Sequence, residues 1–262
     1  MTEWDAAEYN KQSALQKWLA DKHLANLRLD GTERVLDIGC GDGKVTAEIA
    51  DRLPHGSVVG VDPSSAMIAF AQQHFSRPAR RNADFAVADA TQLPYHNEFD
   101  LIVSFNALHW VRDQGAALRC IREALQRSGR VFLEFVPQGT RTSLEDVIEE
   151  TCKAARWARY FTGYVAPYVH LTPQEYREMA SACRLHVERI DVEDESWDFK
   201  TRDAFVSFAR TTFVEWTRAV PDGEHIDFIN EVLDNYRRVD PGTAAGANVF
   251  RFYQMGVVLR AV

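Results

Sequence analysis

Short apolar runs of strand length alternate with helical patterns between residues 34 and 136, and this alternation constrains the fold most strongly. Each run ends at a turn and is followed by apolar residues at three- and four-residue spacing, which is the period of a helix. Such alternation predicts an α/β fold, with a doubly wound, mostly parallel sheet that has helices on both faces. The expected strands are 34–38, 57–61, 84–88, 99–105 and 130–136, and the expected helices are 44–53, 64–75 and 113–126.

The flanking segments follow other patterns. An amphipathic helix is expected within 5–29, so we interpret residues 1–30 as an N-terminal helical lid and 31–136 as the α/β core. After Pro137 the alternation ends, and residues 137–262 are expected to supply the remaining strands and a helical cap over the carboxyl edge of the sheet. This part of the chain has helical patterns at 143–158, 173–182, 202–219 and 224–239, and strand patterns at 184–192 and 249–262.

The composition excludes several classes of protein. The chain has 262 residues and a formal net charge of -8, the wrong sign for a protein that neutralises phosphates or an anionic membrane surface. No apolar run is long enough for a membrane span. The four cysteines lie far apart, without the spacing of a metal site or a disulfide framework. We expect a protein of the reducing cytoplasm that has no metal and no nucleic-acid partner.

Three glycines, Gly39, Gly41 and Gly43, directly follow the first strand and precede a helix. Glycine in this position allows the backbone to approach a ligand closely, although a tight turn alone also needs it. Asp62 ends the second strand, 19 residues beyond Gly43. A carboxylate there can accept both hydroxyl protons of a ribose, or it can cap the next helix. Together the two features predict a nucleoside site.

The charges around this loop distinguish a cationic ligand from a dinucleotide. The spacing is GxGxG rather than GxGxxG, and Asp37 stands two residues before the first glycine. Asp37 and Asp42 would repel a pyrophosphate, but they would attract a sulfonium or an ammonium group. Asp89 and Ala90 follow the third strand and can read an adenine edge. Met67 lies either against the adenine face or in the core.

The segments VLDIGCGDG, VVGVDPS, VADATQLP and FDLIVSFNALHWV resemble those of class I S-adenosylmethionine-dependent methyltransferases over residues 30–136. The resemblance implies a seven-stranded Rossmann-like sheet with S-adenosyl-L-methionine as cofactor. It places Gly39, Cys40 and Gly41 at the methionine end of the donor, Asp62 at the ribose, Asp89 and Ala90 at the adenine, and Asn106 at the edge of the pocket. Pro63 is also expected among the cofactor-binding residues.

A closer resemblance extends outside this core. EYNKQSALQKWLADKHL, LHWVRDQ and APYVHLTPQEY are similar to segments of the juvenile hormone acid and fatty acid O-methyltransferases, and more distantly of the trans-aconitate methyltransferases. The resemblance implies a small hydrophobic carboxylic acid as acceptor, with Gln16 and Trp110 at its carboxylate. The segment ADATQLPY departs from the insect pattern and has the general bacterial form.

A carboxylic acid is ionised at neutral pH, so this reaction needs hydrogen-bond donors that orient the acceptor rather than a general base. A dry apolar pocket also favours the reaction of an anion with a cation. Aromatic residues are abundant in the expected cap and suggest an apolar acceptor: Tyr160, Phe161, Tyr164, Tyr168, Trp197, Phe199, Phe213, Trp216, Phe250 and Phe252.

Four alternatives remain at this point. A polyacid such as aconitate would need inward-facing cations, for which Arg141, Arg156 and Arg159 are candidates. A hydroxyl, nitrogen or carbon acceptor would use His109 as a base, although this histidine is also interpretable as structural. A nicotinamide-dependent oxidoreductase conflicts with the loop spacing and with Asp37. A binding protein that has lost methyl transfer is the fourth alternative.

Overall fold

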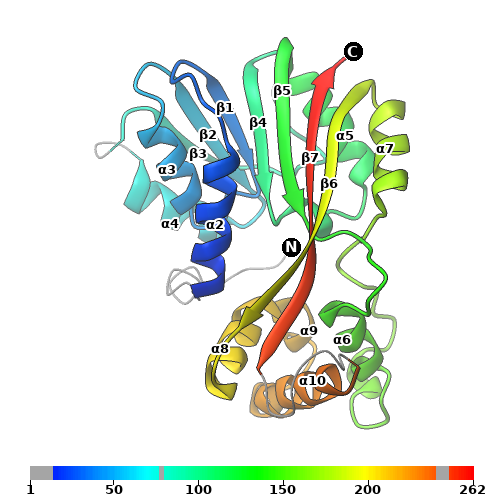
Figure 1. Cartoon of the computed structure of the whole chain (residues 1–262). Helices are drawn as coiled ribbons and strands as arrows, with labels where there is room; N and C mark the ends of the chain where they lie inside the picture. The colour runs from blue at the N-terminus through cyan, green and yellow to red at the C-terminus, as the bar shows by residue number, and fades with distance from the viewer. Residues whose placement is uncertain (1–13, 77–79, 240–247) are drawn as a thin grey trace.

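The computed structural model describes residues 14–76, 80–239 and 248–262. Seven strands form one sheet in the order β3-β2-β1-β4-β5-β7-β6 (Figure 1). Among them, β7 runs antiparallel to both of its neighbours, and the other pairings are parallel. The α/β class and the mostly parallel sheet are therefore confirmed. The strands are β1 (Arg34–Ile38), β2 (Ser57–Asp62), β3 (Ala83–Val87), β4 (Phe99–Phe105), β5 (Leu125–Phe135), β6 (Leu185–Asp198) and β7 (Val249–Ala261).

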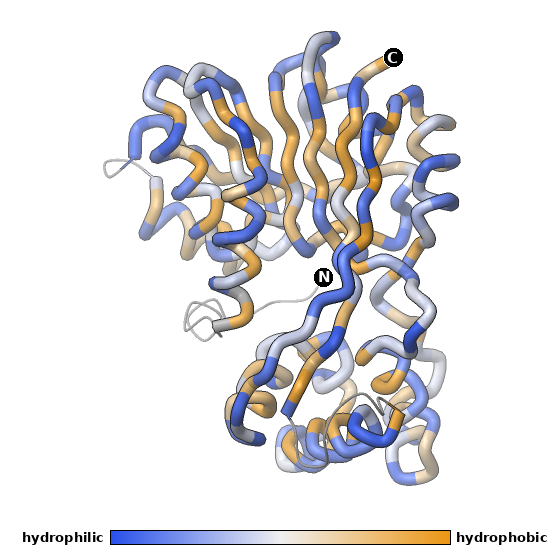
Figure 2. Tube along the Cα trace, in the orientation of Figure 1, coloured by the Kyte–Doolittle hydropathy of each residue, from blue (hydrophilic) through white to orange (hydrophobic). Residues whose placement is uncertain are grey.

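Helices cover both faces of the sheet. On one face α2, α3 and α4 pack in one apolar cluster with β1 to β4, and on the other face α5 and α7 share a second cluster with the sheet. Figure 2 shows the apolar residues concentrated along the strands between these layers. The helices are α2 (Ala14–Asn26), α3 (Lys44–Asp51), α4 (Ser65–Phe75), α5 (Gln114–Ala124) and α7 (Pro173–Ala182).

A helical cap lies beyond the carboxyl edge of the sheet and is carried by a two-stranded ribbon. Strands β6 and β7 remain paired from Leu185 and Ala261 to Asp198 and Val249, well past the end of β5 (Figure 1). The cap has its own apolar cluster, which includes the buried Trp157. Its helices are α6 (Leu144–Cys152), α8 (Arg202–Thr212), α9 (Val214–Thr217) and α10 (His225–Val239), with 3-10 turns at Ala158–Tyr160 and Asp222–Glu224.

One expectation about the cap is wrong. The helix predicted at 173–182 forms as α7, but it packs on the sheet and not in the cap, because Tyr176 and Ala180 are buried in the sheet cluster. A helical period indicates an apolar face without showing which surface that face meets.

Several boundaries also differ from the predicted ones. Strand β5 begins at Leu125, directly after α5, because Leu125 pairs with Phe99 before an irregularity in the register. The predicted helix 202–219 divides into α8 and α9 near Phe213. Strand β6 also continues past the predicted end at residue 192 and includes the exposed Glu193 and Asp194. The part of the predicted N-terminal helix before residue 14 lies outside the described residues.

In the part of the chain that the structure describes, no helix is both long and apolar enough to cross a bilayer.

The cap cluster provides a stability test on a single helix. Phe228 of α10 is fully buried, whereas Ile226 on the same helix is 43% exposed. We expect Phe228→Ala to lower the free energy of unfolding by about 3–5 kcal/mol, because it removes buried apolar surface and leaves a cavity. Ile226→Ala should change it by less than about 0.5 kcal/mol. Urea unfolding of both variants measures the difference, and equal losses would contradict the assigned burial.

Candidate active site

The glycine-rich turn after β1 is fixed to the neighbouring strand β2. Gly39, Gly41 and Gly43 all have positive φ (77°, 53° and 83°), a conformation that favours glycine. The amides of Gly39 and Cys40 both donate to the carbonyl of Val61, at 2.8 and 3.0 Å. The turn therefore holds one defined shape and leads directly into α3.

Three acidic side chains surround this turn. Asp37 is buried and accepts a 2.6 Å hydrogen bond from the hydroxyl of Thr46. Asp42 is also buried, and its Oδ2 has no hydrogen-bond partner among the described residues. Burial raises the pKa of Asp37 to about 7, a rise that the Thr46 hydrogen bond opposes and the nearby Asp62 increases. Burial also raises the pKa of Asp42 and Asp62. Such a cluster of two buried carboxylates and one half-buried carboxylate fits a cationic ligand.

Asp62 connects the glycine turn to the next helix. Its Oδ2 accepts a hydrogen bond from the Gly41 amide at 3.1 Å, and its Oδ1 accepts one from the Ser64 amide at 2.9 Å. Ser64 in turn caps α4 by accepting from the amide of Met67. The carboxylate thus contacts both turns at once, and its contact with a ribose stays a prediction.

A cavity of about 580 Å³, here called the edge cavity, lies along the ends of β1, β2, β3 and β4. Met67 lines it although its side chain is almost fully buried. Asp89 is exposed at this edge, and its Oδ1 accepts from the amide and the hydroxyl of Thr91. The predicted cofactor residues that line the edge cavity are Gly39, Gly41, Asp62, Pro63, Met67, Asp89, Ala90 and Asn106.

A second cavity of about 200 Å³, here called the cap cavity, lies between the glycine turn, helix α2 and the cap. Asp37 and Cys40 line this one, so every predicted cofactor residue lines at least one of the two cavities. The two cavities share their lining at Gly39, Gly41, Phe105, Asn106 and Trp110. The structure therefore brings the predicted residues together around one continuous region.

The 3-10 turn Leu108–Trp110 places two predicted catalytic residues at this junction. Trp110 lines both cavities, and its ring lies 5.8 Å from that of Trp216 in α9. His109 is buried against the cap cavity, and burial, with a smaller effect of His170, lowers the pKa of His109 to about 3. Its Nδ1 has no partner among the described residues. His109 is therefore a neutral hydrogen-bonding group at this wall.

Gln16 lies on α2, but its side chain is outside the described residues, so its predicted role stays a prediction. The three arginines considered for a polyacid line neither cavity. Arg141 pairs with Asp194, and the exposed Arg156 and Arg159 pair with carboxylates of the cap. Of the ten aromatic residues noted in the sequence, Phe250 and Phe252 line the cap cavity.

Sequence reasoning missed three buried polar residues near the junction: His23, Glu134 and Gln254. His23 and Gln254 line the cap cavity, and Glu134 pairs with His23. Glu134 carried a usable signal, because a carboxylate inside the apolar strand RVFLEFV needs a buried partner.

Comparison with known proteins agrees with this geometry. Residues 35–129 match the family described as "Methyltransferase domain". Protein 235L of Invertebrate iridescent virus 6, named as a methyltransferase, is 26% identical over 89% of this chain and 85% of its own length. Juvenile hormone acid O-methyltransferase of Bombyx mori is 31% identical over 61% of this chain and 60% of its own length. Trans-aconitate 2-methyltransferase of Variovorax paradoxus is 31% identical over 60% of this chain and 59% of its own length.

Solved structures share the fold at low sequence identity. The YcgJ protein of Bacillus subtilis superimposes with a TM-score of 0.67 at 17% identity, covering 94% of this chain and 99% of that one. Phosphoethanolamine N-methyltransferase 2 of Haemonchus contortus, in complex with S-adenosyl-L-methionine, has a TM-score of 0.58 at 20% identity, covering 92% of this chain and 53% of that one.

The fold, the two cavities and the domain match define a nucleoside-binding enzyme of the Rossmann-like type. Residues 35–129 form a methyltransferase domain of the class I S-adenosylmethionine-dependent type, with S-adenosyl-L-methionine as its cofactor. The residues present fit this donor, because the unpartnered Oδ2 of Asp42 and the buried Asp37 lie where a cation would compensate their charge.

Gly39→Ala tests the close approach at the turn. A Cβ at Gly39 would lie 2.1 Å from the Cβ of Ala107, so the turn has to move. We expect binding of S-adenosylhomocysteine, measured by calorimetry, to weaken at least about tenfold, or 1.4 kcal/mol. Gly163→Ala is the matched control, since Gly163 also has positive φ but nothing within 4 Å of a Cβ. Unchanged affinity in Gly39→Ala would contradict the assigned geometry.

The raised pKa of Asp37 predicts that donor affinity depends on pH. A cation binds better to the ionised carboxylate, so affinity should rise as the pH rises through about 7. The ionised fraction of a group with this pKa increases about eightfold between about pH 6 and pH 7.5. Calorimetry in buffers of different ionisation enthalpy should also detect a released proton. In Asp37→Asn both effects should disappear, and their persistence would assign them to another group.

Proposed function

We propose that this methyltransferase transfers the methyl group to the carboxylate of a small, largely hydrophobic acid and forms its methyl ester. The observation that carries this proposal is the position of Trp110, where the edge cavity meets the cap cavity. The named acceptors of two relatives, juvenile hormone acid and trans-aconitate, are carboxylic acids and support the same chemistry.

The bound donor supplies an electrophilic methyl group on a sulfonium. The protein has to hold the carboxylate in line with that group and keep water away. The indole N–H of Trp110 is suited to donate to the carboxylate, and the amide of Gln16 is the second proposed donor. Phe208, Phe250 and Phe252 give the cap cavity an apolar wall. No proton has to be removed from an acid that is already ionised.

The charge of the cap cavity favours one anionic group over several. Among the described residues its lining contains Asp37, Asp42 and Glu145 but no lysine or arginine. A polyacid would meet these carboxylates without a cation for each of its own charges. A monoacid needs one counter-ion, and the sulfonium provides it. We therefore favour a hydrophobic monoacid over a polyacid such as aconitate.

One observation favours a second candidate, an acceptor hydroxyl or amine. The Nδ1 of His109 is buried without a described partner and is available for a hydrogen bond to the acceptor. The lowered pKa of His109 argues against proton abstraction, because a group with a pKa of about 3 is a weak base at neutral pH.

We further propose that the protein works in the cytoplasm on a small molecule rather than on a nucleic acid. The four cysteines are free, which suits a reducing compartment. The formal net charge of -8 opposes binding to phosphate backbones.

Trp110→Phe tests the assignment, because it removes the N–H and keeps an aromatic ring. With labelled donor and a series of monoacids of increasing chain length, we expect kcat/KM to fall more than about tenfold, or 1.4 kcal/mol. Trp18→Phe is the matched control, since Trp18 lies on α2 and packs on Trp197 rather than against either cavity.

The pH–rate profile separates the two candidates. For a monoacid, kcat should be flat between about pH 6 and pH 9, because the carboxylate is ionised throughout this range. A rise within this range would show that the acceptor itself loses a proton, because His109 with a pKa of about 3 is neutral throughout, and it would support the second candidate instead. A monoacid series without any ester product would reject the first.

A further inference from the structure

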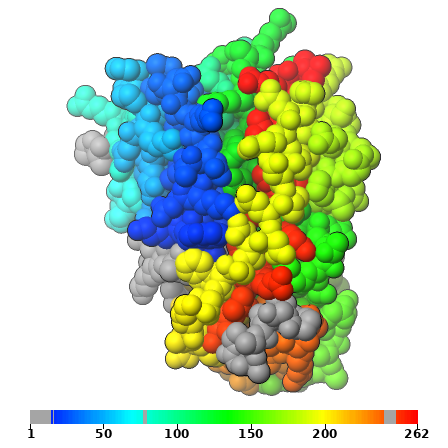
Figure 3. Space-filling model, in the orientation of Figure 1, coloured from blue at the N-terminus to red at the C-terminus, as the bar shows by residue number. Residues whose placement is uncertain are grey.

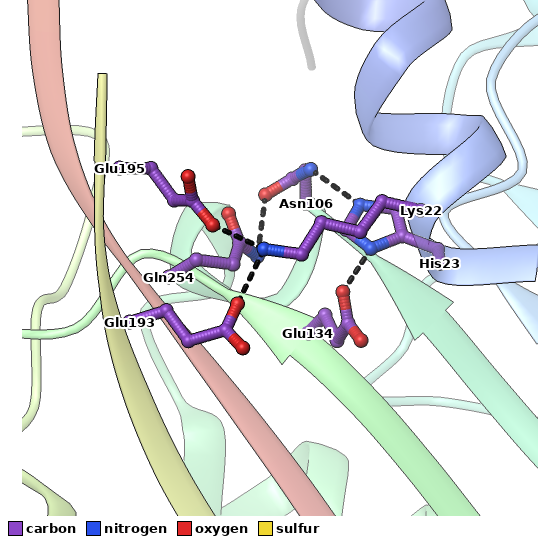
Figure 4. Close-up of polar contacts among 7 residues, drawn as sticks. All are labelled: Lys22, His23, Asn106, Glu134, Glu193, Glu195 and Gln254. Atoms are coloured by element: carbon purple, nitrogen blue, oxygen red, sulfur yellow. Dashed lines mark hydrogen bonds and ion pairs between the residues drawn. The ribbon is translucent and has the colours of Figure 1, made fainter. Parts of the chain in front are cut away.

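Four polar side chains from different parts of the fold connect helix α2 to the carboxyl edge of the sheet. They are His23 on α2, Glu134 on β5, Asn106 directly after β4 and Gln254 on β7, here called the His23 network (Figure 4). The carboxylate of Glu134 pairs with Nδ1 of His23. Nε2 of His23 lies 3.1 Å from Nδ2 of Asn106, and Oδ1 of Asn106 accepts from Nε2 of Gln254 at 3.1 Å.

These contacts fix Asn106 from three sides. Both polar atoms of its side-chain amide are used, and its backbone amide donates to the carbonyl of Glu134 at 2.7 Å. Asn106 also has a φ of 53°, which is uncommon for a residue other than glycine and requires support from its surroundings. The ring of His23 stacks on the ring of Phe105, with 4.9 Å between the ring centroids, so the histidine itself is firmly placed.

The network ends where the two cavities meet. Asn106 and Phe105 line both cavities, and His23 and Gln254 line the cap cavity. The adenosine end of the donor belongs to the edge cavity in our assignment, and its amino-acid end belongs beside Asp37 and Cys40 in the cap cavity. Asn106 therefore lies beside the part of the donor that joins these two ends.

The buried carboxylate of Glu134 has its partner on helix α2. Glu134 is only 6% exposed, and among the described residues His23 is the only basic group that contacts its carboxylate. A buried carboxylate without a partner is strongly unfavourable, so the seated position of α2 is the one that satisfies Glu134. If α2 moved away, Asn106 would lose the partner of its Nδ2 at the same time.

We propose that His23 is a positioning residue for donor binding: it fixes the amide of Asn106 and so couples the seating of α2 to binding of the amino-acid end of the donor. The adenosine end binds in the edge cavity, which the network borders only at Asn106. This proposal concerns the donor and does not depend on which acceptor the enzyme methylates.

Helix α2 offers a control contact that lies outside the network. Lys22 pairs with Glu193 and Glu195 of β6, at the place where α2 and β6 adjoin on the surface (Figures 3 and 4). Lys22 lines neither cavity. Lys22→Ala removes a surface ion pair of α2 and leaves the contacts of Asn106 in place, so it controls for the general effect of a substitution on this helix.

The test measures binding of two ligands by calorimetry, S-adenosylhomocysteine and 5′-methylthioadenosine, which lacks the amino-acid end. In His23→Leu we expect affinity for S-adenosylhomocysteine to fall at least tenfold, and affinity for 5′-methylthioadenosine to change less than twofold. Lys22→Ala should change both less than threefold. Asn106→Ala should resemble His23→Leu, and the double variant should lose no more than either single variant, because the two residues act as a unit.

Three results would each overturn the proposal. They are an equal loss of affinity for both ligands, independent effects of the two substitutions in the double variant, and unchanged affinity of His23→Leu for S-adenosylhomocysteine. If His23→Leu does not fold, Glu134→Gln provides the second variant, since it keeps the size of the partner and removes its charge. Glu134→Gln should lower the affinity for S-adenosylhomocysteine more than the affinity for 5′-methylthioadenosine. An equal loss of both affinities would again contradict the proposal. In the wild-type enzyme, S-adenosylhomocysteine should slow amide exchange in α2 more than 5′-methylthioadenosine does, as reciprocal coupling requires.

Discussion

The concentration of buried and half-buried carboxylates around one backbone turn is the interaction on which the rest of the site depends. Asp37, Asp42 and Asp62 come from the end of β1, the glycine turn and the end of β2, and burial raises the pKa of each. Such an arrangement is unfavourable in the free protein and becomes favourable beside a positive charge. The parallel sheet makes it possible, because adjacent parallel strands end at the same edge.

The second half of the chain builds on this edge. The β6–β7 ribbon carries the cap helices past the sheet, and residues from the ribbon, α2 and α8 complete a cavity that the sheet alone does not enclose. In the proposed arrangement the donor extends from the edge cavity into the cap cavity, and the acceptor binds where the two cavities meet, at Asn106 and Trp110.

The core and its glycine turn were predictable because their signals are local. Strand β4 has the predicted bounds, and all ten predicted cofactor residues line the two cavities. The placement of α7 was not predictable, because a helical period does not identify the surface that its apolar face covers. The His23 network was missed for a related reason. Its members are separated by up to 231 residues in the chain, and only the fold brings them together.

The ribbon that joins the sheet to the cap has a mechanical consequence. From Met255, which lies opposite Phe135, to Arg260, strand β7 pairs with both β5 and β6. From Val249 to Gln254 it pairs with β6 alone. Gly256, at the end of the doubly paired part, leaves open space beside the backbone. Two-stranded ribbons are more strongly twisted than wider sheets. We therefore expect the orientation of the cap relative to the sheet to follow the twist of these two strands rather than the opening of a hinge loop.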